Sequence, residues 1–167
     1  MDNEKLQELL AKQAINTALH DYCRAMDRID DELGRSVFHA DATADYGAMY
    51  EGSGHGFIDY VHERHAAMLV QMHELGNVSI AVRGDSAGSE AYVTATLRFQ
   101  AEDGQLYDVI GKGRYIDRWE RRGGCWAISQ RRYLHAMDSV RPVGEQRFPT
   151  EGARDPSDPS YFALRSL

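Results

Sequence analysis

The feature that most constrains the fold is a change in the spacing of apolar residues near the middle of the chain. Over residues 4–27, apolar side chains recur every three or four positions, which predicts one long amphipathic helix. From about Gly76 onward they recur every second position, which is typical of strands that bury one face. The predicted strands cover residues 77–82, 87–100, 107–121 and 125–137. Helices followed by strands, rather than alternating with them, favour an α+β fold.

A glycine-bearing turn lies between each predicted strand and the next. The turns are Arg83-Gly84-Asp85, Glu102-Asp103-Gly104 and Arg122-Gly123-Gly124. Because turns of this kind join neighbouring antiparallel strands, the second half is interpreted as an antiparallel meander. Two more helices are predicted before it, a short one capped by Asp30 or Asp31 and reaching Phe38, and one over residues 56–68. A curved sheet that wraps these helices would leave a cavity, where we expect the chemistry.

The size and composition of the chain indicate one domain followed by a tail. The 167 residues and the apolar share of 43% are enough for one core, so we expect a single domain over residues 1–140. Residues 141–167 hold all 4 prolines of the chain together with Gly, Ser and charged residues, which predicts an irregular tail. Its apolar end, residues 161–164, is expected to pack on the domain or on a neighbouring subunit.

The net charge and the cysteines exclude several classes of protein. With 26 acidic and 19 basic residues the formal charge is -7, the wrong sign for binding a phosphate backbone or an anionic membrane. No apolar run approaches the ~20 residues of a membrane span, and the first ten residues resemble a helix rather than a signal peptide. Cys23 and Cys125 form no CxxC pair, so neither a disulfide framework nor a zinc site is predicted. We expect a cytoplasmic protein that binds neither nucleic acid nor membranes.

Four short segments, taken together, resemble one family of small domains. They are DYCRAMD at residues 21–27 with Asp30 beyond it, MHELGN at 72–77, GRYIDRW at 113–119 and WAISQR at 126–131. Their order and spacing over residues 5–140 resemble the SnoaL-like branch of the nuclear-transport-factor-2-like superfamily. The resemblance implies an α+β fold in which a cone-shaped, curved antiparallel sheet wraps around the N-terminal helices and encloses a pocket. The branch includes scytalone dehydratase, bile acid 7α-dehydratase, hexachlorocyclohexane dehydrochlorinase, polyketide cyclases, aldehyde-releasing lyases and members without known activity.

Asp27 and His73 are the first candidate catalytic residues. On a helical wheel Asp27 borders the inward arc that carries Tyr22 and Met26, so its carboxylate needs a partner. His73 is expected just before a strand, near the mouth of the cone, and the resemblance implies that it faces Asp27. Asp27 would fix the tautomer of the imidazole, and His73 would remove a proton from the substrate. The alternative is a surface Asp27 and a core His73 without a catalytic role.

Tyr22 and Arg131 complete the predicted catalytic set. The resemblance implies that Tyr22 assists a leaving oxygen, because a phenol can donate a hydrogen bond to it, and a core tyrosine is the open alternative. Arg131 lies where the family often has an arginine, and it could stabilise an enolate or a phenolate. Alternation along the last strand groups it with Ser129, Tyr133 and His135, which would line the pocket. Arg132 would then face away, unless a bulge exchanged the two arginines.

The neighbouring strand is expected to supply another part of the pocket wall. Tyr115 shares its face with Gly111 and Gly113, and the two glycines would leave space for a substrate ring. Tyr115, Tyr133 and His135 are therefore the predicted substrate-binding residues.

The histidines before His73 do not form a convincing metal site. His62 and His65 are three positions apart, with Glu63 between them, and no thiolate or second carboxylate motif completes a ligand set. A solvated helix face is predicted instead, and we expect neither a metal nor another cofactor.

The sequence thus predicts a cofactor-independent lyase for a small hydrophobic substrate, aromatic or alicyclic. The His-Asp dyad would abstract a proton, and water, or an aldehyde such as formaldehyde, would be eliminated. A polyketide-cyclase-like aldol enzyme or an isomerase would use the same residues. A noncatalytic small-molecule-binding or dioxygenase-β-like subunit is the other alternative. The resemblance also implies a homo-oligomer, either a trimer or a dimer.

Overall fold

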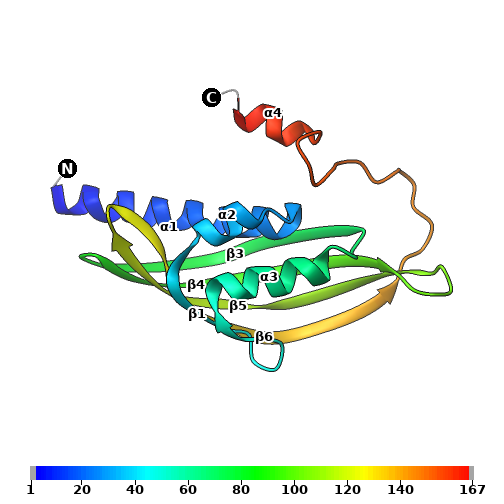
Figure 1. Cartoon of the computed structure of the whole chain (residues 1–167), viewed down its shortest axis with the longest axis horizontal. Coiled ribbons are helices and arrows are strands. Elements are labelled where there is room, and N and C mark those ends of the chain that lie inside the picture. The colour runs from blue at the N-terminus through cyan, green and yellow to red at the C-terminus, as the bar shows by residue number, and fades with distance from the viewer. Residues whose placement is uncertain (1–2, 166–167) are drawn as a thin grey trace.

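The structure is a computed structural model, and it describes residues 3–165. The first half contains α1 (Asn3–Arg28), α2 (Asp31–Ser36), β1 (Phe38–Asp45), β2 (Glu51–Ser53) and α3 (Gly54–His65). The second half contains β3 (Val70–Arg83), β4 (Ser86–Gln100), β5 (Leu106–Arg122), β6 (Cys125–Pro142) and α4 (Pro159–Arg165). Figure 1 shows the long strands β3 to β6 running beside α1 and α3, with α4 beyond α1.

The strands of the described region form one curved, open sheet in the order β2-β1-β6-β5-β4-β3. Neighbouring strands are antiparallel except for β1 and β6, which run parallel. The predicted α+β class and the curved, mainly antiparallel sheet around N-terminal helices are therefore confirmed. Within the described residues, no helix is long and apolar enough to span a membrane.

The inward face of α1 supplies much of the core, and the end of this helix positions the site. Ile15, Leu19 and Met26 are at most 1% exposed, whereas Leu9 and Leu10 are exposed, so the predicted apolar face is buried only beyond the first turns. Ile29 then takes a φ of 52°, which is strained for a β-branched residue and ends the helix. Asp27 consequently lies in the last helical turn.

Strands β1 and β2 were not predicted, and β3 begins seven residues earlier than expected. The β1 sequence, FHADATAD, mixes alanine with aspartate and lacks the β-branched run that marks a strand. The predicted start of β3 at Asn77 is instead an irregularity within the strand, where the register shifts between Gly76 and Ser79 and Asn77 has a φ of 38°. His73 therefore lies in β3 rather than before it, and the pocket-facing part of the strand is longer than predicted.

The C-terminal tail is more ordered than the prediction of an irregular segment. Strand β6 continues to Pro142, and the helix α4 forms near the end of the described chain. The tail packs on its own domain, because Arg24 donates to Ser160 Oγ at 3.3 Å and Arg28 lies 3.6 Å from Asp158. The Asp158 side chain also accepts the backbone N–H groups of Ala153 and Ser160, which fixes the turn before α4.

Candidate active site

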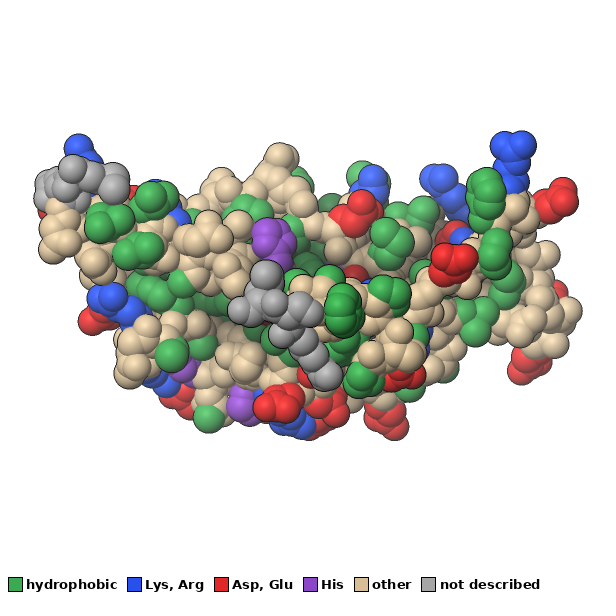
Figure 2. Space-filling view, turned by 90° about the horizontal axis from the view of Figure 1, so that it is seen from above, with side chains coloured by type: hydrophobic (Ala, Val, Ile, Leu, Met, Phe, Trp, Pro, Cys, Tyr) green, Lys and Arg blue, Asp and Glu red, His purple; other side chains and the backbone are tan. Residues whose placement is uncertain are grey.

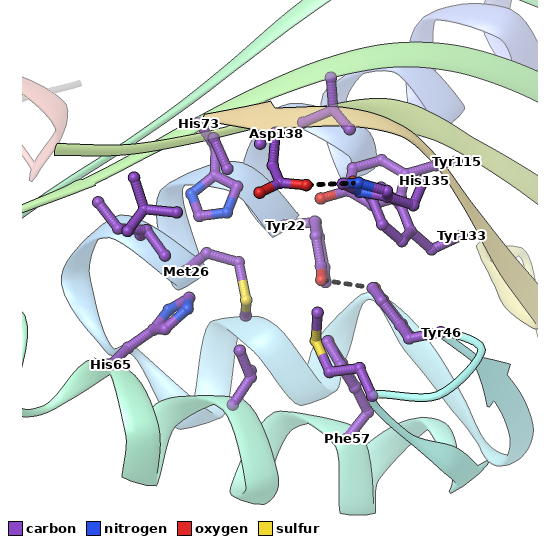
Figure 3. A pocket seen from close by; sticks show the side chains of 17 residues that line it. Tyr22, Met26, Tyr46, Phe57, His65, His73, Tyr115, Tyr133, His135 and Asp138 are labelled. Carbon is purple, nitrogen blue, oxygen red and sulfur yellow. Dashed lines mark hydrogen bonds and ion pairs between the residues drawn. The ribbon is translucent and has the colours of Figure 1, made fainter. Parts of the chain in front are cut away.

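A cavity of about 290 Å³ lies between the helices and the concave face of the sheet (Figure 3). Most of its wall is aromatic or aliphatic. The polar lining groups are the side chains of Tyr22, Tyr46, Tyr115, Tyr133, His65, His73, His135 and Asp138. Such a wall suits a small apolar ligand whose orientation is set by a few polar contacts.

Asp27 and His73 are in direct contact at one side of this cavity. Nδ1 of His73 lies 2.7 Å from Oδ1 of Asp27, and the backbone N–H of His73 donates to Oδ2 at 3.1 Å. The side chain of His73 is 7% exposed and lines the cavity, whereas Asp27 lies behind it. Because Nδ1 faces the carboxylate, Nε2 is the nitrogen available to a ligand. This is the arrangement that a general base requires, although its catalytic role stays a prediction.

Tyr22 lines the cavity together with a tyrosine that was not predicted. Its hydroxyl lies 2.7 Å from that of Tyr46, which follows β1, and the ring of Tyr46 stacks on Phe57. Burial raises the pKa of both hydroxyls well above the ordinary tyrosine value, so both remain protonated at neutral pH. One hydroxyl donates to the other, which leaves a second proton for a hydrogen bond to a ligand. No sequence pattern marked Tyr46, because its strand was missed.

Arg131 does not line the cavity, so the prediction that it shares the pocket wall with Tyr133 and His135 is wrong. Its side chain is fully buried, and Nε and Nη2 donate to the two carboxylate oxygens of Asp117 at 2.8 and 2.7 Å. The guanidinium lies 4.1 Å from the ring centre of Tyr22 and 4.2 Å from that of Tyr115. Burial alone would lower the pKa of Arg131, but the Asp117 carboxylate holds it well above its usual value. Alternation correctly predicted that Arg131 faces inward. The rings of Tyr22 and Tyr115, however, lie between its guanidinium and the cavity.

Two of the three β6 neighbours of Arg131 lie where alternation placed them. Tyr133 and His135 line the cavity, and Arg132 faces outward, where it lies 3.4 Å from Asp45. Ser129 does not line the cavity, because the register between β5 and β6 skips this residue. A bulge therefore changes the face of Ser129 without exchanging the two arginines.

A second bulge brings Asp138 into the cavity, which the sequence did not predict. Regular alternation from His135 would turn Met137 inward and Asp138 outward. The register between β5 and β6 skips Ala136 instead, so Asp138 lines the cavity and Met137 is exposed. Nε2 of His135 then lies 3.1 Å from Oδ1 of Asp138, as the dashed line in Figure 3 marks.

The two glycines of β5 have different roles. A Cβ atom at Gly111 would meet nothing within 4 Å, and this residue lines the cavity beside Tyr115, as predicted. A Cβ atom at Gly113 would lie 2.5 Å from the carbonyl oxygen of Leu134 and equally close to the ring of Tyr133. Gly111 therefore leaves space for a ligand, whereas Gly113 lets Tyr133 pack against the strand.

His62 and His65 are buried, so the predicted solvated helix face is wrong. Nδ1 of His62 lies 2.5 Å from Oδ1 of Asp31, outside the cavity. His65 lines the cavity, and its ring centre is 6.1 Å from that of His73. Burial, assisted by His73 and His62, lowers the pKa of His65 to about 4. In the described part of the chain, no group of three or more His, Cys, Asp or Glu residues could hold a metal ion.

Comparisons with known proteins agree with this fold. A solved hexachlorocyclohexane dehydrochlorinase, LinA type 2, matches with a TM-score of 0.74 and 17% identity over 89% of this chain and 99% of that chain. A structure named "Putative Scytalone Dehydratase" from Novosphingobium aromaticivorans matches with a TM-score of 0.70 and 20% identity, over 86% and 97% of the two chains. The beta subunit of a "putative aromatic-ring-hydroxylating dioxygenase" from the same organism has a TM-score of 0.63 and 21% identity, over 78% and 92%.

The sequence itself also matches a family model. No curated protein matches it significantly. The model of the SnoaL-like domain matches residues 7–132, which is most of the chain. The protein therefore belongs to the SnoaL-like domain family, within the nuclear-transport-factor-2-like superfamily.

Proposed function

We propose that the protein is a cofactor-independent lyase that removes a proton from a small cyclic substrate and expels an oxygen leaving group, such as water. The observation that carries the proposal is the contact between Asp27 and His73 at the wall of an apolar cavity. A carboxylate that holds Nδ1 of an imidazole fixes the tautomer and stabilises the imidazolium that forms when Nε2 takes a proton.

The elimination uses His73 as the base and the tyrosine pair as the acid. Nε2 of His73 takes a proton from a substrate carbon, and the electrons of that C–H bond form the new carbon–carbon double bond. The bond from the neighbouring carbon to oxygen breaks, and the hydrogen-bonded pair of Tyr22 and Tyr46 supplies the proton that completes a water molecule. The imidazolium of His73 then returns its proton to the phenolate, which restores the starting state.

The second candidate is a noncatalytic or supporting subunit, and one neighbour favours it. The dioxygenase beta subunit shares the fold with this chain. An imidazole that is oriented by a carboxylate and faces a cavity argues for the enzyme instead, because a supporting subunit has no need of a positioned base. Expulsion of an aldehyde, an aldol cyclisation and an isomerisation begin with the same proton transfer, so product analysis distinguishes them.

The test is turnover of uncharged cyclic β-hydroxyketones, followed by the absorbance of the conjugated product. We expect His73→Gln to lower turnover by about 10²- to 10⁴-fold, the contribution of a positioned base. Asp27→Asn should also slow the reaction strongly, because the amide keeps the shape but removes the charge. Tyr22→Phe should cost as much as His73→Gln if water is the leaving group, and less if the leaving group needs no proton.

Glu74→Gln is the matched control, since Glu74 is the exposed neighbour of His73 on β3. This variant should retain full turnover. Circular dichroism melts of each variant separate lost activity from lost folding. A folded His73→Gln protein with undiminished turnover would end the acid-base proposal. Binding of the ketones without any product from the wild-type protein would favour the supporting-subunit candidate.

A further inference from the structure

His65 lines the cavity but has no part in the proposed elimination. It is the last residue of α3 and is 8% exposed, and Figure 3 shows its ring directed toward the cavity from the side opposite the sheet. Its Nδ1 is sealed from solvent and has no hydrogen-bond partner among the described residues. Its Nε2 has no hydrogen-bond partner among the described residues either, but this nitrogen is not sealed, so a ligand in the cavity can reach it.

The surroundings of His65 indicate which of its nitrogens meets a ligand. The carboxamide of Gln71 donates to the backbone carbonyl of His65 at 3.2 Å, and its own Oε1 is also buried without a partner. Nδ1 is the sealed nitrogen of the ring. Nε2 is the nitrogen left for the cavity.

The charge of the cavity wall restricts the ligand further. With a pKa of about 4, His65 is an uncharged imidazole at neutral pH and offers no positive charge to an anion. The residues that line the cavity include no Lys or Arg, and they include the carboxylate of Asp138. Arg131 is behind the tyrosine rings and is neutralised by Asp117. A carboxylate ligand would therefore lose its hydration without gaining a cation, at a large cost.

We propose that His65 is a specificity-determining residue that hydrogen-bonds a hydroxyl group of an uncharged ring substrate in the cavity. The proposal rests on the proposed function in placing this ligand beside His73, and it names the class of substrate. A hydroxyl group suits the site because it both donates and accepts, so it can pair with either tautomer of His65. The apolar wall holds the ring, and the imidazole selects its polar edge.

The test compares three ligands with one ring skeleton: naphthalene, 2-naphthol and 2-naphthoate. Their affinities at pH 7 are measured by calorimetry or by ligand fluorescence, so no turnover is needed. We expect the wild-type protein to bind 2-naphthol about tenfold more tightly than naphthalene, the range of one hydrogen bond in an apolar site. It should bind 2-naphthoate at least about tenfold more weakly than 2-naphthol, because the carboxylate is desolvated without a partner.

Variants of His65 assign the preference to this side chain. His65→Leu should bind 2-naphthol and naphthalene with equal affinity, and His65→Gln should keep part of the preference through its amide. His62→Leu is the matched control, because His62 is buried one turn earlier in α3 and bonds Asp31 outside the cavity. In ¹⁵N spectra, the His65 ring signals of the wild-type protein should move with 2-naphthol and stay in place with naphthalene.

Three results would overturn the proposal. They are equal wild-type affinities for 2-naphthol and naphthalene, a preference that survives in folded His65→Leu protein, and binding of neither ligand. The outcome is separable from that of the lyase proposal. If cyclic hydroxyketones are not turned over but the hydroxyl preference disappears in His65→Leu, the lyase proposal fails and this one stands. If turnover depends on His73 but the preference is independent of His65, the reverse holds.

Discussion

The buried ion pair between Arg131 and Asp117 should contribute strongly to the stability of the fold. An arginine that acted only on a substrate would contribute little to stability. Both side chains are fully buried and joined by two hydrogen bonds of 2.7 and 2.8 Å. Removing either partner leaves a buried, unpaired charge, which costs about 3–5 kcal/mol. We therefore expect Arg131→Met and Asp117→Leu each to lower the melting temperature by roughly 6–20 °C, at about 2–4 °C per kcal/mol in a chain of this size.

The double variant tests whether the two losses of unfolding free energy arise from the same ion pair. Arg131→Met combined with Asp117→Leu leaves no buried charge, so its loss of unfolding free energy should fall short of the sum of the single losses by about 3 kcal/mol. Urea titrations at pH 7 measure all three variants. Arg132→Met is the control, because Arg132 is 66% exposed and its pair with Asp45 should contribute less than about 1 kcal/mol. Additive single losses, or losses as small as that of the control, would refute the reasoning.

Three further predictions concern the strand glycines, the acid response and assembly. Gly113→Ala should lower the unfolding free energy by about 1–3 kcal/mol in urea titrations, because its Cβ meets Tyr133, whereas Gly111→Ala should change it by less than about 1 kcal/mol. In the unfolded chain His65 takes up a proton below about pH 6.5, whereas burial in the folded chain delays this protonation until about pH 4. Acid should therefore destabilise the wild-type protein by about 3 kcal/mol more than His65→Leu at pH 4. An equal acid response in the two proteins would contradict this cause. Light scattering should show a homo-oligomer, with a trimer expected rather than a dimer. Hydrophobic side chains reach the surface in Figure 2, and Phe148 in the tail is 80% exposed. A monomer at micromolar concentration would refute this prediction.

Periodicity predicted the elements whose burial is regular and missed those whose burial is not. Helix α1 and strands β4 and β5 follow one period over long stretches, so their positions were predicted to within a few residues. Strand β1 pairs in parallel with β6 and has a register shift between Phe38 and Thr43, so its buried residues do not alternate. A pattern of period two cannot detect such a strand. The failure to predict β1 affected the site, because Tyr46 follows this strand directly.

The same limitation applies to the site. Alternation placed Tyr115, Tyr133 and His135 on the cavity face, and the structure has them there. Alternation also grouped Arg131 with them, but it carries no information about depth, and the tyrosine rings intervene. The bulge at Ala136 left no recognisable signal, since bulges depend on pairing with another strand rather than on local sequence.

Several polar side chains of the cavity are already paired with another side chain, whereas the ring of His65 is not. His73 contacts Asp27, Tyr22 contacts Tyr46, and His135 contacts Asp138. A partner fixes the orientation of each of these side chains before any ligand arrives, which is what acid-base chemistry requires of its reacting groups. Neither ring nitrogen of His65 has such a partner among the described residues, so a ligand that bonds Nε2 adds a contact without breaking one. Reactivity should therefore depend on the paired groups, and discrimination between ligands on His65.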